Sequence, residues 1–215
     1  MPTERFYRLP EEKRRTIQKA AFREFARVPV DKASINQIIR EAEISRGSFY
    51  TYFEDKWDVL AYIFEESQKE TQEYLYDCLE RLDGDIWKAL DAFFERIVEI
   101  CCGEERRQFI KNVLEHTGAD DMFMGRRKRQ CPDYEVAGED VARWMYTHYS
   151  REKMRDMGFR EFQSFFIMAI AAIAIELRRF FDGKTLDEIR EGYRMKLKIL
   201  WQGAAPVPSS IGMVR

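Results

Sequence analysis

Glycine and proline are scarce in this chain, which has 11 glycines and 6 prolines among 215 residues. Sustained alternation of polar and apolar residues between Asn-Gly or Asp-Gly turns is missing, which argues against an all-β or doubly wound architecture. Gly-rich phosphate loops and a Gly-x-Ser-x-Gly motif are missing too. Long stretches instead carry apolar side chains at helical spacing. We therefore expect an all-α fold of about nine helices, with an N-terminal three-helix domain and a C-terminal helical bundle.

Long hydrophobic runs and cysteine motifs are also missing. The longest apolar run covers residues 165–175, whereas a membrane-spanning helix needs about 20 residues. The first residues, Met-Pro-Thr-Glu-Arg, are not followed by the apolar region of a secretory signal. Metal-ligand spacing is absent among Cys78, Cys101, Cys102 and Cys131. We expect a soluble, cytoplasmic protein with reduced cysteines and with neither a metal nor another cofactor.

Charge of one sign is not in large excess, because the formal net charge is −2. Its distribution along the chain is uneven. Residues 1–56 hold 12 Lys/Arg against 9 Asp/Glu, and residues 57–215 hold 24 against 29. The N-terminal quarter is therefore the part whose charge suits a nucleic acid, and the acidic remainder need not touch one.

The N-terminal quarter has the pattern of a helix-turn-helix. Apolar residues recur at helical spacing from about Glu11 to Arg27, and Pro29 ends that helix. Ser34 and Gln37 form a capping box that opens a short helix, and Ser45 can cap a second one after a turn. A packing helix followed by two short helices is typical of a helix-turn-helix, whose second helix enters the major groove of DNA.

The second short helix has distinct inner and outer faces. Phe49 and Phe53 lie four residues apart and are expected to pack inward. The small Gly47 would allow close approach of the backbone. The outer-face candidates for contacts with DNA are Arg46, Ser48, Thr51 and Tyr52.

The sequence around this helix resembles a known family. Residues 45–56, Ser-Arg-Gly-Ser-Phe-Tyr-Thr-Tyr-Phe-Glu-Asp-Lys, are similar to the signature of the TetR-type (TetR/AcrR) transcriptional regulators. Ala20-Ala21, Phe25 and Ser34-Ile35 also fit, so the resemblance covers about residues 10–60. Three positions depart from the family pattern: Glu43 replaces a turn glycine, Ile39 replaces an alanine, and Val28-Pro29 stands where a glycine usually follows the first helix.

The resemblance implies contacts with a double-stranded DNA operator. Tyr50, Lys56 and Ser34 would contact phosphates. Arg46 is the best candidate for reading guanine, because its guanidinium fork matches the O6 and N7 acceptors. The other residues expected at the DNA are Asn36, Ser45, Gly47, Ser48, Thr51 and Tyr52.

In this family the remaining helices form a homodimer and often a small-molecule pocket. The pairing helices would be Phe159 to Phe181 and Thr185 to Trp201, because the first is apolar all round its centre and must be covered. A monomer that covers it internally is the alternative. The candidate effector-pocket residues are Phe64, Phe94, Phe109, His116, Trp144, His148 and Phe166. The alternative is ordinary core positions for the aromatic residues and exposed or hydrogen-bonded rings for the two histidines.

The expected organisation has three parts: a DNA-binding domain at residues 1–56, an effector-binding and dimerisation domain at 57–203, and a flexible tail at 204–215. The expected function is that of a ligand-responsive, homodimeric repressor on a palindromic operator. Two other classes compete with it. An enzyme has little support, because the chain has two histidines and no recognisable catalytic motif. A helical protein-interaction module without DNA reading is the stronger alternative.

Overall fold

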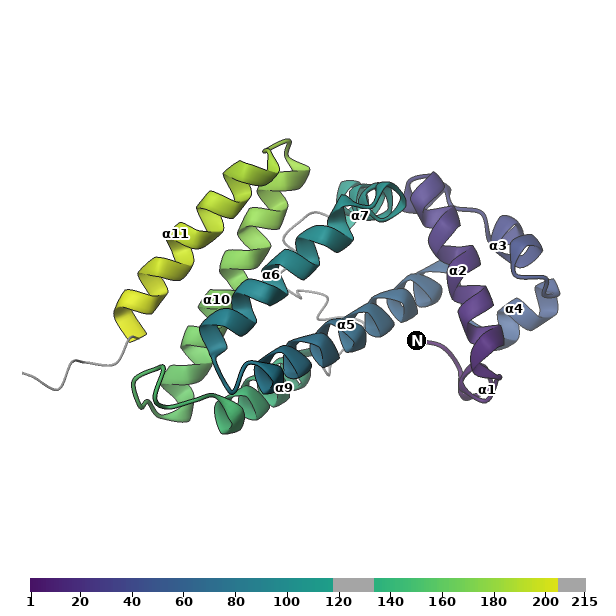
Figure 1. Ribbon diagram of the computed structural model, residues 1–215. Helices are drawn as coiled ribbons and strands as arrows, with labels where there is room; N and C mark the ends of the chain where they lie inside the picture. The colour runs from purple at the N-terminus through teal and green to yellow at the C-terminus, as the bar shows by residue number, and fades with distance from the viewer. Residues whose placement is uncertain (118–133, 205–215) are drawn as a thin grey trace, which may run out of the picture. The chain divides into compact units, whose positions relative to one another are not determined.

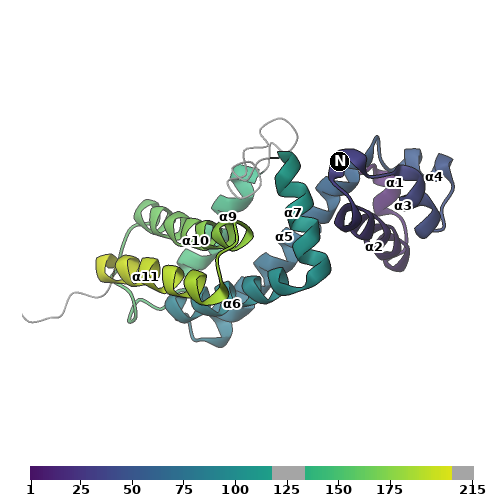
Figure 2. The same cartoon turned by 90° about the horizontal axis from the view of Figure 1, so that it is seen from above.

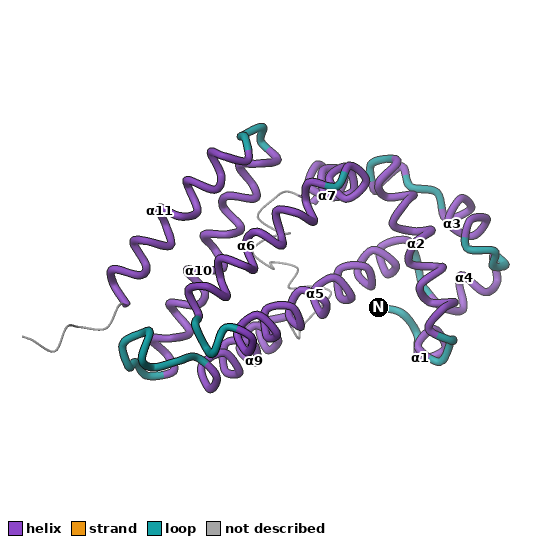
Figure 3. Tube along the Cα trace, in the orientation of Figure 1, coloured by secondary structure: helices purple, strands orange, loops and turns teal. Residues whose placement is uncertain are grey.

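The computed structural model describes residues 1–117 and 134–204. Two compact units divide the chain: Met1–Gln72 with Val98–Cys131, and Glu73–Ile97 with Pro132–Arg215, in each case as far as the chain is described. All regular elements in the described ranges are helical (Figure 3). The expected all-α class is therefore confirmed. The tail expected at 204–215 lies outside the described residues except for Ala204.

Ten α-helices occur in the described ranges, one more than expected (Figure 1). The additional helix is α1, whose four residues are too few to show helical spacing in the sequence. The helices that contribute to the first unit are α1 (Glu4–Tyr7), α2 (Glu11–Arg27), α3 (Ile35–Glu41), α4 (Arg46–Tyr52), α5 (Lys56–Arg81) and α7 (Glu104–Thr117), with a 3-10 turn, η1 (Val30–Lys32), before α3. The second unit holds α9 (Tyr134–His148), α10 (Phe159–Phe181) and α11 (Leu186–Ala204), and α6 (Ile86–Cys102) and α5 contribute residues to both units.

The predicted helix caps are present. Ser34 Oγ accepts a hydrogen bond from the Gln37 amide at 3.4 Å, and Ser45 Oγ accepts one from the Ser48 amide at 2.9 Å. A further capping box opens α11, where Thr185 and Glu188 exchange hydrogen bonds between side chain and backbone. These bonds satisfy amides that have no partner inside a helix, and they fix where each of the three helices begins.

The core of the first unit is aromatic and aliphatic. The apolar stripe of α2 is buried as its spacing predicts, with Ile17 and Phe25 fully inaccessible. Helix α7 packs along α2, and the rings of Phe22 and Phe109 stack at 4.6 Å between centroids. The buried Asn112 side chain on α7 donates hydrogen bonds to two carbonyls at the end of α2, those of Phe25 (2.8 Å) and Ala26 (2.9 Å).

The turn between α3 and α4 is built around Glu43, the residue that stands where the family has glycine. Glu43 adopts a left-handed conformation with φ of 51°. The Ile44 amide donates to the Ile39 carbonyl and the Glu43 amide to the Arg40 carbonyl, which is the Schellman pattern of a helix end. Lys13 Nζ on α2 donates to the Ala42 carbonyl at 3.0 Å and to the Glu43 carbonyl at 3.3 Å. The turn geometry is therefore retained without glycine.

In the second unit, α10 and α11 lie side by side (Figure 2). Glu176 on α10 is fully buried between them and forms ion pairs with Arg179 at 2.7 Å and with Lys196 of α11. Gly192 allows this close approach, because a Cβ atom there would lie 2.6 Å from Glu176 Oε2. A buried carboxylate is stable only when it is paired. Arg179 pairs with Glu176 within α10, and Lys196 supplies the ion pair that links α10 to α11.

The described ranges contain neither a helix suited to crossing a membrane nor a cluster of side chains suited to a metal. Cys78 and Cys101 are buried, and Cys102 is exposed. Burial raises the pKa of the Cys101 thiol to about 12, so this thiol is protonated and unreactive at neutral pH. Cys131 lies outside the described residues.

Replacing Glu43 with glycine should stabilise the protein. Glycine adopts the left-handed conformation without a steric penalty, and its larger entropy in the unfolded chain removes only part of that gain. We expect Glu43→Gly to raise the free energy of unfolding by about 0.5–1 kcal/mol in urea titrations. Glu41→Gly, two residues earlier in the right-handed helix, is the matched control and should lower it by about 1 kcal/mol. Equal losses in both variants would contradict the assigned turn.

Candidate nucleic-acid interface

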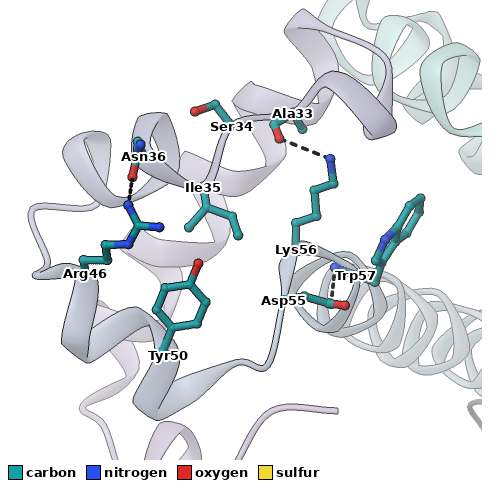
Figure 4. A pocket seen from close by; sticks show the side chains of 9 residues that line it. All are labelled: Ala33, Ser34, Ile35, Asn36, Arg46, Tyr50, Asp55, Lys56 and Trp57. Carbon is teal, nitrogen blue, oxygen red and sulfur yellow. Dashed lines mark hydrogen bonds between the residues drawn. The ribbon is translucent and has the colours of Figure 1, made fainter.

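The outer faces of α3 and α4 border one cleft of about 310 Å³, shown from close by in Figure 4. Its wall combines the start of α3, the outer face of α4 and the start of α5. Five of the residues predicted to bind DNA lie there together, and four further residues were not predicted. The lining residues are Ala33, Ser34, Ile35, Asn36, Arg46, Tyr50, Asp55, Lys56 and Trp57.

Helix α4 is held by its inner face and open on its outer face. Phe49 and Phe53 are fully buried, with ring centroids 5.5 Å apart, as their spacing predicts. Arg46 and Tyr50 stand on the other face, and Tyr50 is 47% exposed. Burial of the two phenylalanine rings supplies the stability that a helix of seven residues lacks by itself.

Arg46, Asn36 and Tyr50 form a connected group across the cleft (Figure 4). Arg46 Nη1 donates to Asn36 Oδ1 at 3.3 Å, and its guanidinium carbon lies 5.7 Å from the centre of the Tyr50 ring. These contacts restrict the guanidinium but use only one of its five N–H donors. The others can therefore form the paired hydrogen bonds that recognise guanine.

Lys56 ties the start of α5 to the turn before α3. Its Nζ donates to the carbonyls of Asp31 at 2.5 Å and Ala33 at 3.3 Å. An ammonium group has three donors, so one stays available for an anion. The neighbouring Asp55 carboxylate accepts the amides of Trp57 (2.7 Å) and Asp58 (3.1 Å) and thereby caps α5.

Ser34 is placed at the cleft, but its amide is already used. This amide donates to Glu24 Oε1 at 2.8 Å, and the same carboxylate pairs with Arg27 at 2.8 and 2.9 Å. Glu24 is buried, although sequence reasoning did not single it out. The available signal was a carboxylate next to Phe25 on the apolar side of α2. The Ser34 hydroxyl is thus the group of this residue that can reach a phosphate.

The other predicted DNA-binding residues do not line the cleft. The Ser45 and Ser48 hydroxyls share a hydrogen bond at 2.8 Å, and Thr51 Oγ1 donates to the Gly47 carbonyl at 2.9 Å. Gly47 is exposed, and a Cβ atom there would have only an ordinary contact with Ser45. Tyr52 is half-buried, with its ring 6.1 Å from that of Phe6.

The residues predicted for the effector pocket are spread over both units. In the first unit, Phe64 and Phe109 pack with ring centroids 5.9 Å apart. His116 belongs to α7, and its side chain lies outside the described part of the chain. The pocket therefore stays a prediction here.

In the second unit the predicted residues make aromatic contacts. Trp144 stacks on His148 at 3.9 Å between ring centroids, and Phe166 is buried. Phe94 stacks at 3.9 Å on Tyr193, a residue that sequence reasoning did not select. The Tyr193 hydroxyl is buried and has no hydrogen-bond partner among the described residues. Burial raises the pKa of this phenol, and the nearby Asp91 and Glu95 add to the shift.

Comparison with known proteins agrees with this geometry. Residues 17–63 match the family model of the bacterial regulatory proteins of the tetR family. The HTH-type transcriptional regulator AcrR of Shigella flexneri is 28% identical over 106 residues, which are 49% of this chain and 49% of AcrR. The chain thus matches about half the length of this curated relative.

Two solved structures share the fold. A TetR-family transcriptional regulator from Pectobacterium atrosepticum has a TM-score of 0.66 at 18% identity, over 92% of this chain and 96% of that one. SmeT, the repressor of the Stenotrophomonas maltophilia multidrug efflux pump SmeDEF, has a TM-score of 0.62 at 18% identity, over 96% and 98%. The matched segment and the shared fold together confirm the resemblance to the TetR-type regulators that the sequence shows, with residues 17–63 as the part that carries the family pattern.

Proposed function

We propose that this protein is a cytoplasmic transcriptional repressor that binds a palindromic DNA operator and has no enzymatic activity. The observation that carries the proposal is the cleft between α3 and α4. Its two cations, two hydroxyls and one amide come from Arg46, Lys56, Tyr50, Ser34 and Asn36. These are the side chains that contact phosphates and base edges in helix-turn-helix proteins.

The roles divide by chemistry. Arg46 reads a base in the major groove, and Asn36, which orients it, can also reach a base edge. Tyr50, Lys56 and the Ser34 hydroxyl bind phosphates and set the register of α4 on the duplex. The other residues proposed to lie near the duplex belong to α4 or its N-cap and surround the contacts made by Arg46 and Tyr50. They are Ser45, Gly47, Ser48, Thr51 and Tyr52.

A homodimer would present two such helices to successive half-sites. Support comes from large apolar side chains that are exposed on the neighbouring helices α10 and α11, with Ile167 at 60% and Ile199 at 63%. Two copies that pair these helices as a four-helix bundle would cover this surface. The other exposed apolar side chains on the two helices are Met168, Ile175, Met195 and Trp201.

A small-molecule effector would control the spacing of the two recognition helices by favouring one conformation. The buried Tyr193 hydroxyl, which has no hydrogen-bond partner within residues 1–117 and 134–204, supports an effector site in the second unit, because a ligand acceptor there would remove an energetic penalty. Phe94 lies against the same ring. We propose the other predicted pocket residues as further effector-binding side chains. They are Phe64, Phe109, His116, Trp144, His148 and Phe166.

Selection of bound duplexes from a random DNA pool tests the proposal. At about 150 mM salt, where non-specific binding is weak, the full-length protein should enrich a palindrome. A protein that is folded and dimeric but enriches no duplex would overturn DNA reading. The interaction-module alternative would then be favoured, with the same cleft as its docking surface.

Arg46→Ala should weaken binding to the enriched palindrome by about 1–3 kcal/mol and relax base preference at one position per half-site. The reason is the loss of paired hydrogen bonds to one guanine. Titrations with duplexes changed at single positions measure both effects. Arg15→Ala is the matched control, because this exposed arginine on α2 pairs with Glu11 and does not line the cleft. An Arg46 variant with unchanged base preference would contradict the assigned role.

Lys56→Gln should weaken the enriched palindrome and an unrelated duplex alike. The change removes one charge that faces a phosphate, so the slope of log affinity against log salt should fall in magnitude by about one. Lys69→Gln serves as the control, because that ammonium is paired with Glu65 and Glu66 on α5. A salt slope equal to that of the parent would exclude Lys56 as a phosphate contact.

A further inference from the structure

Residues 2–7, the segment before α2, contact the C-terminal end of the recognition helix α4. The Thr3 amide donates to the Tyr52 carbonyl at 2.9 Å, and Thr3 Oγ1 donates to the Thr51 carbonyl at 2.8 Å. One residue thus supplies two hydrogen bonds to the last two carbonyls of α4.

These carbonyls need an external partner. The last four carbonyls of a helix have no donor inside it, and α4 has only seven residues. Its final turn carries neither a basic side chain nor a glycine cap, since Phe53 follows in an extended conformation. The Phe53 amide serves only the Phe49 carbonyl. Thr3 therefore does for α4 what a C-cap would otherwise do.

The segment is itself anchored in the core of the first unit. Phe6 is fully buried, with its ring 4.7 Å from that of Phe53 and 4.8 Å from that of Tyr62 between centroids. Tyr7 Oη donates to Glu65 Oε2 on α5 at 3.3 Å. Thr3 therefore belongs to a segment that is anchored by the burial of Phe6 and by the hydrogen bond of Tyr7 to α5. Its hydrogen bonds connect the C-terminal end of α4 to this anchored segment.

We propose that residues 2–7 position the recognition helix for DNA, with Thr3 as the positioning residue. Tyr50 lies in the turn that Thr3 caps, and its ring lies 5.7 Å from the guanidinium carbon of Arg46. Fraying of this turn would therefore release Arg46, the side chain proposed to read a base. Keeping the turn formed before binding lowers the conformational cost of forming the complex. The inference rests on the proposed function, because it concerns the same DNA-binding surface.

Thr3→Val tests the inference, since valine has the shape of threonine without its hydroxyl. In the full-length protein, Thr3→Val should bind the palindrome enriched by the parent about three- to tenfold more weakly. Thr3→Ser, which keeps the donor, should restore affinity to within about twofold. Amide hydrogen exchange at residues 50–53 should be faster in Thr3→Val than in Thr3→Ser.

Affinity for an unrelated duplex distinguishes a loss of helix positioning from a general loss of folded protein, because unfolding would weaken binding to both duplexes. Binding to it depends on charge, so its affinity should be the same for the parent and both variants. Equal affinities of Thr3→Val and Thr3→Ser for the palindrome would overturn the inference and leave the proposed function intact. Equal weakening of Thr3→Val on both duplexes would also overturn it. A parent that enriches no duplex would instead overturn the proposed function.

Discussion

The proposed DNA-binding surface depends on the burial of Phe49 and Phe53 beneath a helix too short to be stable alone. Their rings fix which face of α4 is turned outward, and that face carries Arg46 and Tyr50. The same burial brings Phe53 against Phe6, so the segment before α2 shares one core with the recognition helix. The surface chemistry therefore follows from packing on the opposite side of the helix.

Hydrogen bonds from polar side chains fix the helix ends and turns, whose geometry apolar burial alone does not determine. Lys13 fixes the turn before α4, and Lys56 fixes the turn before α3. The Glu24 carboxylate accepts a hydrogen bond from the Ser34 amide, just before α3. Asn112 performs the same task at the end of α2. Each of these side chains satisfies backbone groups at a helix end, where the helix itself offers no partner. Lys13, Glu24 and Asn112 thus act on the geometry of the first unit without lining the cleft.

Sequence reasoning recovered what is periodic and local. The bounds of α2 and α10 follow from apolar spacing, and the Ser34 and Ser45 caps from short-range patterns. It missed α1, whose stability comes from burying Phe6 against distant residues. It grouped Tyr52 with the outer face, although a spacing of three from Phe49 turns this ring toward Phe6. Glu24 pairs locally with Arg27, but its partner Ser34 lies 10 residues away. The partners of Lys56 lie 23–25 residues away, beyond the reach of short-range patterns.

The central claim is that the cleft between α3 and α4 contacts DNA. Amide hydrogen exchange of the full-length protein, with and without the enriched duplex, tests it most directly. The duplex should slow exchange mainly at the start of α3, along α4 and in the first turn of α5, where backbone and side chains would be covered. Unchanged exchange in these three segments, at duplex concentrations that saturate the protein, would contradict the account.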